Sequence, residues 1–154
     1  IPAYNEETTL AEVIDRVLAL PSRPEVIVVD DGSTDRTAEI IRRYQQEKGI
    51  IGVFCPRNGG KGAAIQAGLK HVTQPYTIIQ DADLEYYPEE YEALLKPVRE
   101  GKAQVVYGSR NLRHPAALKN QFTPSFQSAS WDRLKRRRAA TAAMNSRAEA
   151  TVAC

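Results

Sequence analysis

Two carboxylates stand one residue apart at Asp81 and Asp83, with Glu85 close behind, directly after the run 76–80. That run is short and partly β-branched, which favours a buried strand. At the carboxyl end of a parallel strand the chain leaves a dry interior for the crevice where open α/β sheets bind ligands. Carboxylates in such a place are costly unless a cation neutralises them. Their hard oxygen ligands suit Mg²⁺ or Mn²⁺ bound together with substrate phosphates. The alternative is that they only cap a helix or form a turn.

Polar residues also follow three other expected strands, in the loops 2–6, 30–33 and 108–110. Because the carboxyl ends of parallel strands meet at one edge of a sheet, we expect all four loops on one rim. Carboxylates can accept hydrogen bonds from a base and a ribose, and the planar guanidinium of Arg110 can grip phosphate oxygens, so the rim suits a nucleoside diphosphate. The alternatives are that Asp30 and Asp31 are turn and cap residues and that Arg110 makes a surface salt bridge.

A glycine-rich turn, Gly59-Gly60-Lys61-Gly62, precedes an expected helix. The Walker pattern also needs a glycine at position 55 and Ser or Thr at position 62, where this chain has Cys55 and Gly62, so an ATPase loop is excluded. The turn can still bring backbone N–H groups and Lys61 near an anion. Its alternative role is to allow close packing.

Length and composition suit one domain with a core, since the chain has 154 residues of which 42% are hydrophobic. It contains neither a signal-peptide pattern nor an apolar run of about 18 residues, so we expect no membrane span. Cys55 and Cys154 lack metal-ligand or disulfide spacing, which fits a reducing compartment. The opening Ile1-Pro2 reads as the end of a strand, and we expect a partial domain.

Charge divides the chain into two segments. Residues 1–112 hold 13 basic and 17 acidic residues, whereas residues 113–154 hold 8 and 2. We therefore expect a folded acidic domain over residues 1–113 and a basic, poorly ordered tail of uncertain origin over residues 114–154. The Arg/Lys cluster at 133–138 could contact nucleic acid or anionic lipid. A solvated charged helix or a non-native junction explains it more simply, and we expect no nucleic-acid partner.

Apolar periodicity predicts alternating helices and strands. Helices are expected at 7–20 with Asn5 as N-cap, from the turn after Asp35 to Lys48, after the glycine turn, and from Pro88 onward, where Pro97 should bend or shorten the last helix. Strands are expected at 25–29, 50–54, 76–80 and 104–107. Such alternation calls for right-handed crossovers and a mostly parallel sheet with helices on both faces, which is a three-layer, Rossmann-like α/β sandwich.

Taken together, the motifs resemble a family-two glycosyltransferase of the GT-A fold, a nucleotide-diphospho-sugar transferase fold, here truncated. The residues that carry the resemblance are, in chain order, 1–7 (IPAYNEE), 28–35 (VVDDGSTD), 58–64 (NGGKGAA), 81–85 (DADLE) and 108–110 (GSR). The most similar branch is the dolichyl- or polyprenyl-phosphate mannose and glucose synthases. A sugar-1-phosphate nucleotidylyltransferase would instead begin with a glycine-rich, arginine-bearing loop.

The resemblance implies metal-dependent transfer of a sugar from GDP-mannose or UDP-glucose type donors to a polyprenyl or dolichyl phosphate, with inversion. It implies a nucleotide pocket formed by Pro2, Ala3, Tyr4, Glu6, Asp31, Lys61, Asp81, Ala82 and Asp83. The expected metal ligands for Mg²⁺ or Mn²⁺ are Asp81, Asp83 and Glu85, and the expected catalytic residues are Asp81, Asp83 and Arg110.

Similar enzymes work at the cytoplasmic face of a membrane, so we expect that location and a peripheral membrane contact. The family's stretch after Gly108-Ser109-Arg110 has no counterpart in residues 114–154. The alternative is therefore a nucleotide-sugar-binding remnant that is catalytically incomplete.

Overall fold

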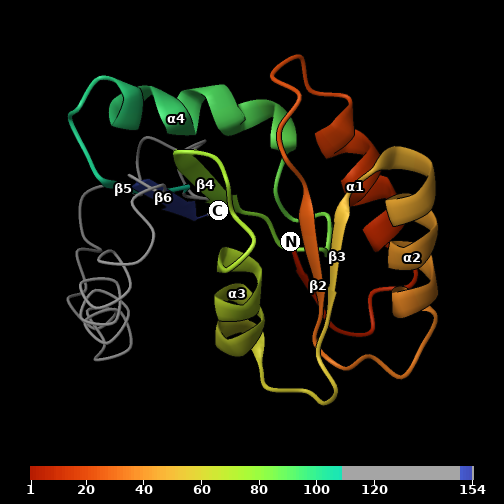
Figure 1. Ribbon diagram of the computed structural model, residues 1–154. Helices are drawn as coiled ribbons and strands as arrows, with labels where there is room; N and C mark the ends of the chain where they lie inside the picture. The colour runs from red at the N-terminus through yellow and green to blue at the C-terminus, as the bar shows by residue number, and fades with distance from the viewer. Residues whose placement is uncertain (109–149, 154) are drawn as a thin grey trace, which may run out of the picture.

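The computed structural model describes residues 1–108 and, as backbone alone, residues 150–153. Strands and helices alternate along the chain, as the sequence predicted (Figure 1). The strands are β1 (Pro2–Ala3), β2 (Ile27–Asp30), β3 (Ile51–Phe54), β4 (Tyr76–Ile79), β5 (Val105–Tyr107) and β6 (Ala150–Ala153). The helices are α1 (Leu10–Leu18), α2 (Thr37–Lys48), α3 (Lys61–Leu69) and α4 (Tyr91–Arg99), with a 3-10 turn, η1 (Pro88–Glu90), directly before α4.

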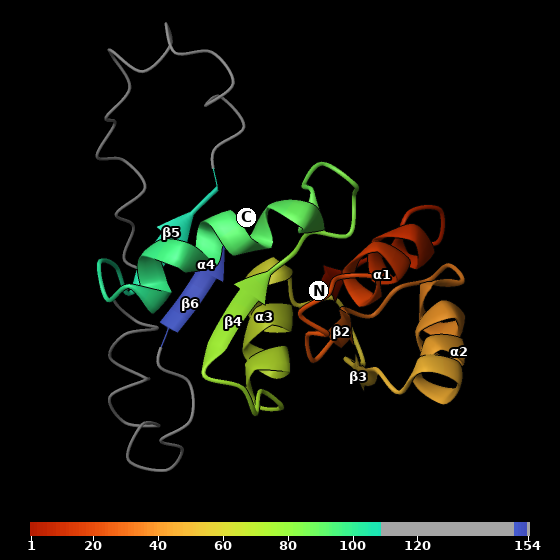
Figure 2. The same ribbon diagram turned by 90° about the horizontal axis from the view of Figure 1, so that it is seen from above.

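Every strand pair is parallel, which confirms the α/β fold, but the strands form two sheets where one was expected. Their orders are β1-β2-β3 and β4-β6-β5. Helix α3 packs against β1 and β2 on the face opposite α1 and α2, so helices lie on both faces of the first sheet (Figures 1 and 2). Helix α4 covers β5 of the second sheet. Strand β1 pairs with β2 only at Pro2 and Ala3. In the described part of the chain no ladder joins β1 to β4.

The core of the first sheet is closed by the apolar stripes of α1 and α2. Leu10, Ile14, Val28 and Ile41 have no exposed surface. A second, smaller cluster lies under α4. None of the helices in the described part has both the length and the apolar character needed to cross a membrane.

Helix α1 begins later than the sequence predicted, and Asn5 is not its N-cap. The helix starts at Leu10 after Thr9, while Asn5 adopts a left-handed conformation with φ +56°. The side-chain oxygen of Asn5 accepts the N–H of Thr34 at 2.9 Å, so it serves the loop before α2 instead. The end of α2 is as predicted, since Gly49 follows it with φ +71°.

Strand β6 pairs with both β4 and β5. The sequence predicted no strand in residues 114–154, since Ala150–Ala153 is short and has no strong apolar pattern. The expected boundary near residue 113 and the expected tail over 114–149 lie outside the described residues.

A crevice of about 270 Å³ separates the two sheets and is lined mainly by apolar side chains of β2, β4, α3 and α4. At its border the α-amino group of Ile1 donates a hydrogen bond of 2.7 Å to the carbonyl oxygen of Ile27. Burial lowers the pKa of this amine from 8.0 to about 5, although the negative charge of Asp81 opposes the shift. The residue keeps some exposed surface, but its nitrogen is enclosed. The buried hydroxyl of Thr77 has no hydrogen-bond partner among the described residues.

Candidate functional site

Two aspartates stand at the carboxyl end of the first sheet, where Asp30 is the last residue of β2 and Asp31 begins the loop after it. Asp30 is 5% exposed and Asp31 3% exposed. One carboxylate oxygen of Asp30 accepts the N–H of Ser33 at 3.0 Å, which closes the turn. The N–H of Asp31 donates to the carbonyl oxygen of Ala3 at 2.9 Å, so the loops after β1 and β2 lie side by side.

The carboxylate of Asp31 organises the glycine turn between β3 and α3. Its two oxygens accept the N–H groups of Gly59 at 2.9 Å and of Gly60 at 2.7 Å. Gly32 has φ +72°, and a Cβ there would lie 2.6 Å from the carbonyl carbon of Arg57. The two loops therefore touch through backbone, and glycine is required for that approach.

Lys61, the first residue of α3, connects this turn to the second sheet. Its ammonium lies 2.6 Å and 2.7 Å from the two carboxylate oxygens of Asp81, which follows β4. The loops after β2, β3 and β4 thus converge. The sequence predicted the loops after β2 and β4 on one rim, but the glycine turn after β3 was not among the four loops expected there. The structure brings Asp31, Lys61 and Asp81 into one linked set.

The segment after β4 alternates between buried and exposed side chains. Ala82 is 4% exposed, whereas Asp83 is exposed and one of its carboxylate oxygens accepts the N–H of Glu85 at 3.1 Å. Leu84 has φ +62°, a conformation that L-residues adopt at a cost and that clusters at functional sites. The roles of Asp83 and Glu85 as metal ligands stay predictions.

A buried polar pair, Gln80 and Tyr91, hydrogen-bonds to the backbone at the start of this segment. The hydroxyl of Tyr91 donates to the side-chain oxygen of Gln80 at 2.9 Å, and the amide nitrogen of Gln80 donates to the carbonyl oxygen of Asp81 at 3.0 Å. Gln80 is 2% exposed and Tyr91 7% exposed. The sequence did not predict this pair as a supporting element, although a polar residue at the end of an apolar strand is a usable signal.

Among the predicted residues of the first loop, Ala3 is buried in β1 next to the half-buried Pro2, and Tyr4 is 45% exposed. The carboxylate of Glu6 accepts the hydroxyl of Thr9 at 2.7 Å, so it is engaged within its own turn. The exposed ring of Tyr4 is accessible to a ligand.

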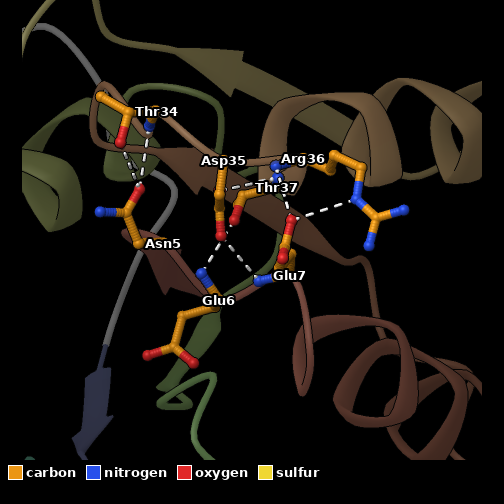
Figure 3. Close-up of polar contacts among 7 residues, drawn as sticks. All are labelled: Asn5, Glu6, Glu7, Thr34, Asp35, Arg36 and Thr37. Carbon is orange, nitrogen blue, oxygen red and sulfur yellow. Dashed lines mark hydrogen bonds and ion pairs between the residues drawn. The ribbon is translucent and has the colours of Figure 1, made fainter.

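The loops before α1 and α2 bind each other's backbone, which Figure 3 shows. The N–H of Glu6 donates to the hydroxyl of Thr37 at 2.8 Å, and that of Glu7 donates to Asp35 at 3.1 Å. In return, the N–H of Arg36 donates to the carboxylate of Glu7 at 3.0 Å. The turns that precede the two helices thus hold each other through reciprocal hydrogen bonds.

Hydrogen bonding between these two loops lowers the pKa values of two carboxyl groups. Burial alone would raise the pKa of Asp35, but hydrogen bonds from Thr37 and from the N–H of Glu7 hold it below its ordinary value. Backbone and side-chain hydrogen bonds from Arg36 lower the pKa of Glu7. The sequence did not single out Glu7, Asp35 or Thr37 for this role.

A divalent cation fits the donor chemistry of the rim. Asp81 and Asp83 are hard oxygen ligands, and two carboxylates are what Mg²⁺ typically takes before water and phosphates complete its shell. Within the described residues no group of three or more His, Cys, Asp or Glu side chains could hold a metal ion. Arg110 lies outside the described residues.

The crevice between the sheets is a separate feature. Asp31, Lys61, Asp81 and Asp83 do not belong to its lining. The candidate site is therefore the polar rim and not this apolar space.

Comparisons with known proteins agree with one another. Residues 1–147 match the family model described as Glycosyl transferase family 2. Over 107 residues the chain is 39% identical to an undecaprenyl-phosphate 4-deoxy-4-formamido-L-arabinose transferase of Edwardsiella ictaluri and 42% identical to the one of Photorhabdus laumondii. Each match covers 66% of this chain and 33% of the relative, so the chain spans about a third of their length. The crystal structure of S. aureus TarS superposes with a TM-score of 0.57 and 25% identity, over 69% of this chain and 20% of TarS.

Proposed function

From its membership of glycosyl transferase family 2, whose model matches residues 1–147, we propose that the chain binds a nucleotide-sugar donor. The sugar is then transferred to a polyprenyl phosphate. The donor is of the GDP-mannose or UDP-glucose type, and the transfer inverts the anomeric carbon. The observation that carries this proposal is the convergence of Asp31, Lys61 and Asp81 on one rim, with Asp83 exposed beside them.

Each loop has its own task in this proposal. Tyr4 offers an exposed aromatic face for the base, next to Pro2, Ala3 and Glu6. Asp31 holds the glycine turn, so that Lys61 can place its positive charge against a diphosphate. Such preset positions reduce the ordering cost of binding.

Asp81 and Asp83, with Glu85 as a further candidate, would hold the Mg²⁺ or Mn²⁺ ion. When bound, that ion supplies neutralisation of the charge on the departing nucleoside diphosphate. Arg110 is proposed to contact a phosphate oxygen. Binding and orienting the diphosphate is then the work of these side chains together.

The acceptor is proposed from the names of the relatives, which act on undecaprenyl phosphate. A lipid phosphate is already anionic, so its attack needs no strong protein base. Such an acceptor would place the protein at the cytoplasmic face of a membrane, through a peripheral contact.

Calorimetric titration with UDP-glucose and GDP-mannose, with and without Mn²⁺, tests donor binding. We expect binding that depends on Mn²⁺ and that is reduced at least tenfold by Asp83→Asn, since one of two carboxylate ligands is removed. Glu47→Gln is the matched control, because it removes one exposed carboxylate from the last turn of α2, at the end of the helix opposite the loop after β2. Failure to bind either donor under any condition would sink the proposal.

A second assay separates transfer from binding. The chain is incubated with the donor it binds and with undecaprenyl phosphate in detergent, and the lipid product is separated by chromatography. Formation of glycosylated lipid supports a transferase. Metal-dependent donor binding without product supports the alternative, a donor-binding remnant that is catalytically incomplete.

A further inference from the structure

Lys61 already occupies the carboxylate that is proposed to face the cation. Its ammonium contacts both oxygens of Asp81, at 2.6 Å and 2.7 Å. The Lys61 side chain is 56% exposed and the Asp81 side chain 19% exposed. Lys61 thus places a positive charge at the candidate metal site.

The backbone of Lys61 is fixed, although its side chain is exposed. Gly60, just before it, is held by the carboxylate of Asp31 and has φ +84°. Helix α3 itself lies close on β2, since a Cβ on Gly68 would come within 3.0 Å of Val29. Rotation of the Lys61 side chain is therefore the simplest way to release Asp81.

An ammonium and a divalent cation compete for the same carboxylate lone pairs, and their like charges repel at such distances. A metal ion can take the lone pairs of Asp81 that now face Lys61 only if Lys61 moves away. Lys61 then needs another anion, and a diphosphate arriving with the metal provides one.

We propose that Lys61 is a charge placeholder, which neutralises Asp81 in the ligand-free protein and passes to the donor diphosphate when a divalent cation takes its place. The inference rests on the proposed function and deepens it. Its consequence is that cation and nucleotide bind together and not independently. Because such coupling is reciprocal, each ligand raises the affinity for the other by the same factor.

Mn²⁺ binding to the full chain, followed by the paramagnetic resonance of free Mn²⁺ with and without UDP or GDP, tests this. An exposed ion pair changes an equilibrium constant by at most about fivefold. We expect Lys61→Gln to bind Mn²⁺ alone about fivefold more tightly than the wild type, and nucleotide to raise that affinity less than in the wild type. Lys61→Arg keeps the charge and should keep the wild-type coupling.

Lys70→Gln is the matched control, because Lys70 is exposed at the other end of α3 and its loss changes the net charge equally. It should behave as the wild type. If Lys61→Gln does not fold, Lys61→Met gives the same comparison.

The inference is overturned if Lys61→Gln binds Mn²⁺ alone no more tightly than Lys70→Gln. In that case Mn²⁺ binding by the wild type with UDP or GDP leaves the proposed function standing. Lack of Mn²⁺ binding by the wild type with either nucleotide overturns both.

Discussion

Asp31→Asn tests whether the carboxylate after β2 holds the glycine turn. Asp31 is 3% exposed and accepts two backbone N–H groups, from Gly59 at 2.9 Å and Gly60 at 2.7 Å. Hydrogen bonds to a charged group contribute roughly 1.5–3 kcal/mol each. Asparagine keeps one acceptor and turns an NH₂ group toward the other N–H, so one bond is lost and two donors face each other. We expect the free energy of unfolding to fall by about 2–3 kcal/mol without any ligand.

Urea unfolding followed by far-UV circular dichroism measures this loss. Asp30→Asn is the matched control, because Asp30 is 5% exposed and has one such bond, from Ser33 at 3.0 Å. It should lose only about 1 kcal/mol, because the amide oxygen of asparagine can still accept this single N–H. If Asp31→Asn unfolds within about 0.5 kcal/mol of the wild type while donor affinity collapses, Asp31 acts on the ligand and the argument is refuted.

Three further expectations follow from local geometry. Gly60→Ala should destabilise the fold by about 1–3 kcal/mol, since Gly60 has φ +84° and ψ 162°. Gly62→Ala, equally unobstructed but helical, should stabilise it by up to about 1 kcal/mol, and equal effects of the two in urea unfolding would contradict this. Tyr91→Phe should cost about 1–2 kcal/mol by removing the donor to the buried Gln80, and an unchanged unfolding free energy would argue against that bond. In a chain that begins at Ile1, stability should rise with pH between about 5 and 8, by at most about 4 kcal/mol, because the unfolded amine (pKa 8.0) holds a proton that the folded amine (pKa about 5) has lost. Acetylation of that amine should abolish the slope of stability against pH, and a retained slope would assign it to other groups.

Alternation of helices and strands was predictable because apolar spacing and turn residues are local signals. The unbroken apolar run before Asp30 predicted a strand, and Gly49 predicted the end of α2. The division of the strands into two sheets was not predictable, because it depends on pairing between strands that lie far apart in the chain. The same holds for β6, whose residues form a strand through pairing on both edges rather than through their own pattern.

The candidate site also has features that the sequence could predict and features that it could not. The rule that loops after parallel strands share one rim placed Asp31 and Asp81 near each other, and the structure links them through Lys61. The hydrogen-bond partners of these side chains could not be predicted, because they lie far away in the chain. Those of Asp31 are 28 and 29 positions away, and that of Lys61 is 20 positions away. Asn5 illustrates the limit, since its side chain serves the loop before α2 and not its own helix.

The shared capping of α1 and α2 has a consequence for how the first two loops open. The amide hydrogens of Glu6 and Glu7 and those of Arg36 and Thr37 depend on acceptors that stay in place only while both turns are formed. Neither turn can open alone without breaking hydrogen bonds that the other turn makes. In native-state hydrogen exchange these amides should therefore exchange with one common opening free energy, as a single cooperative unit.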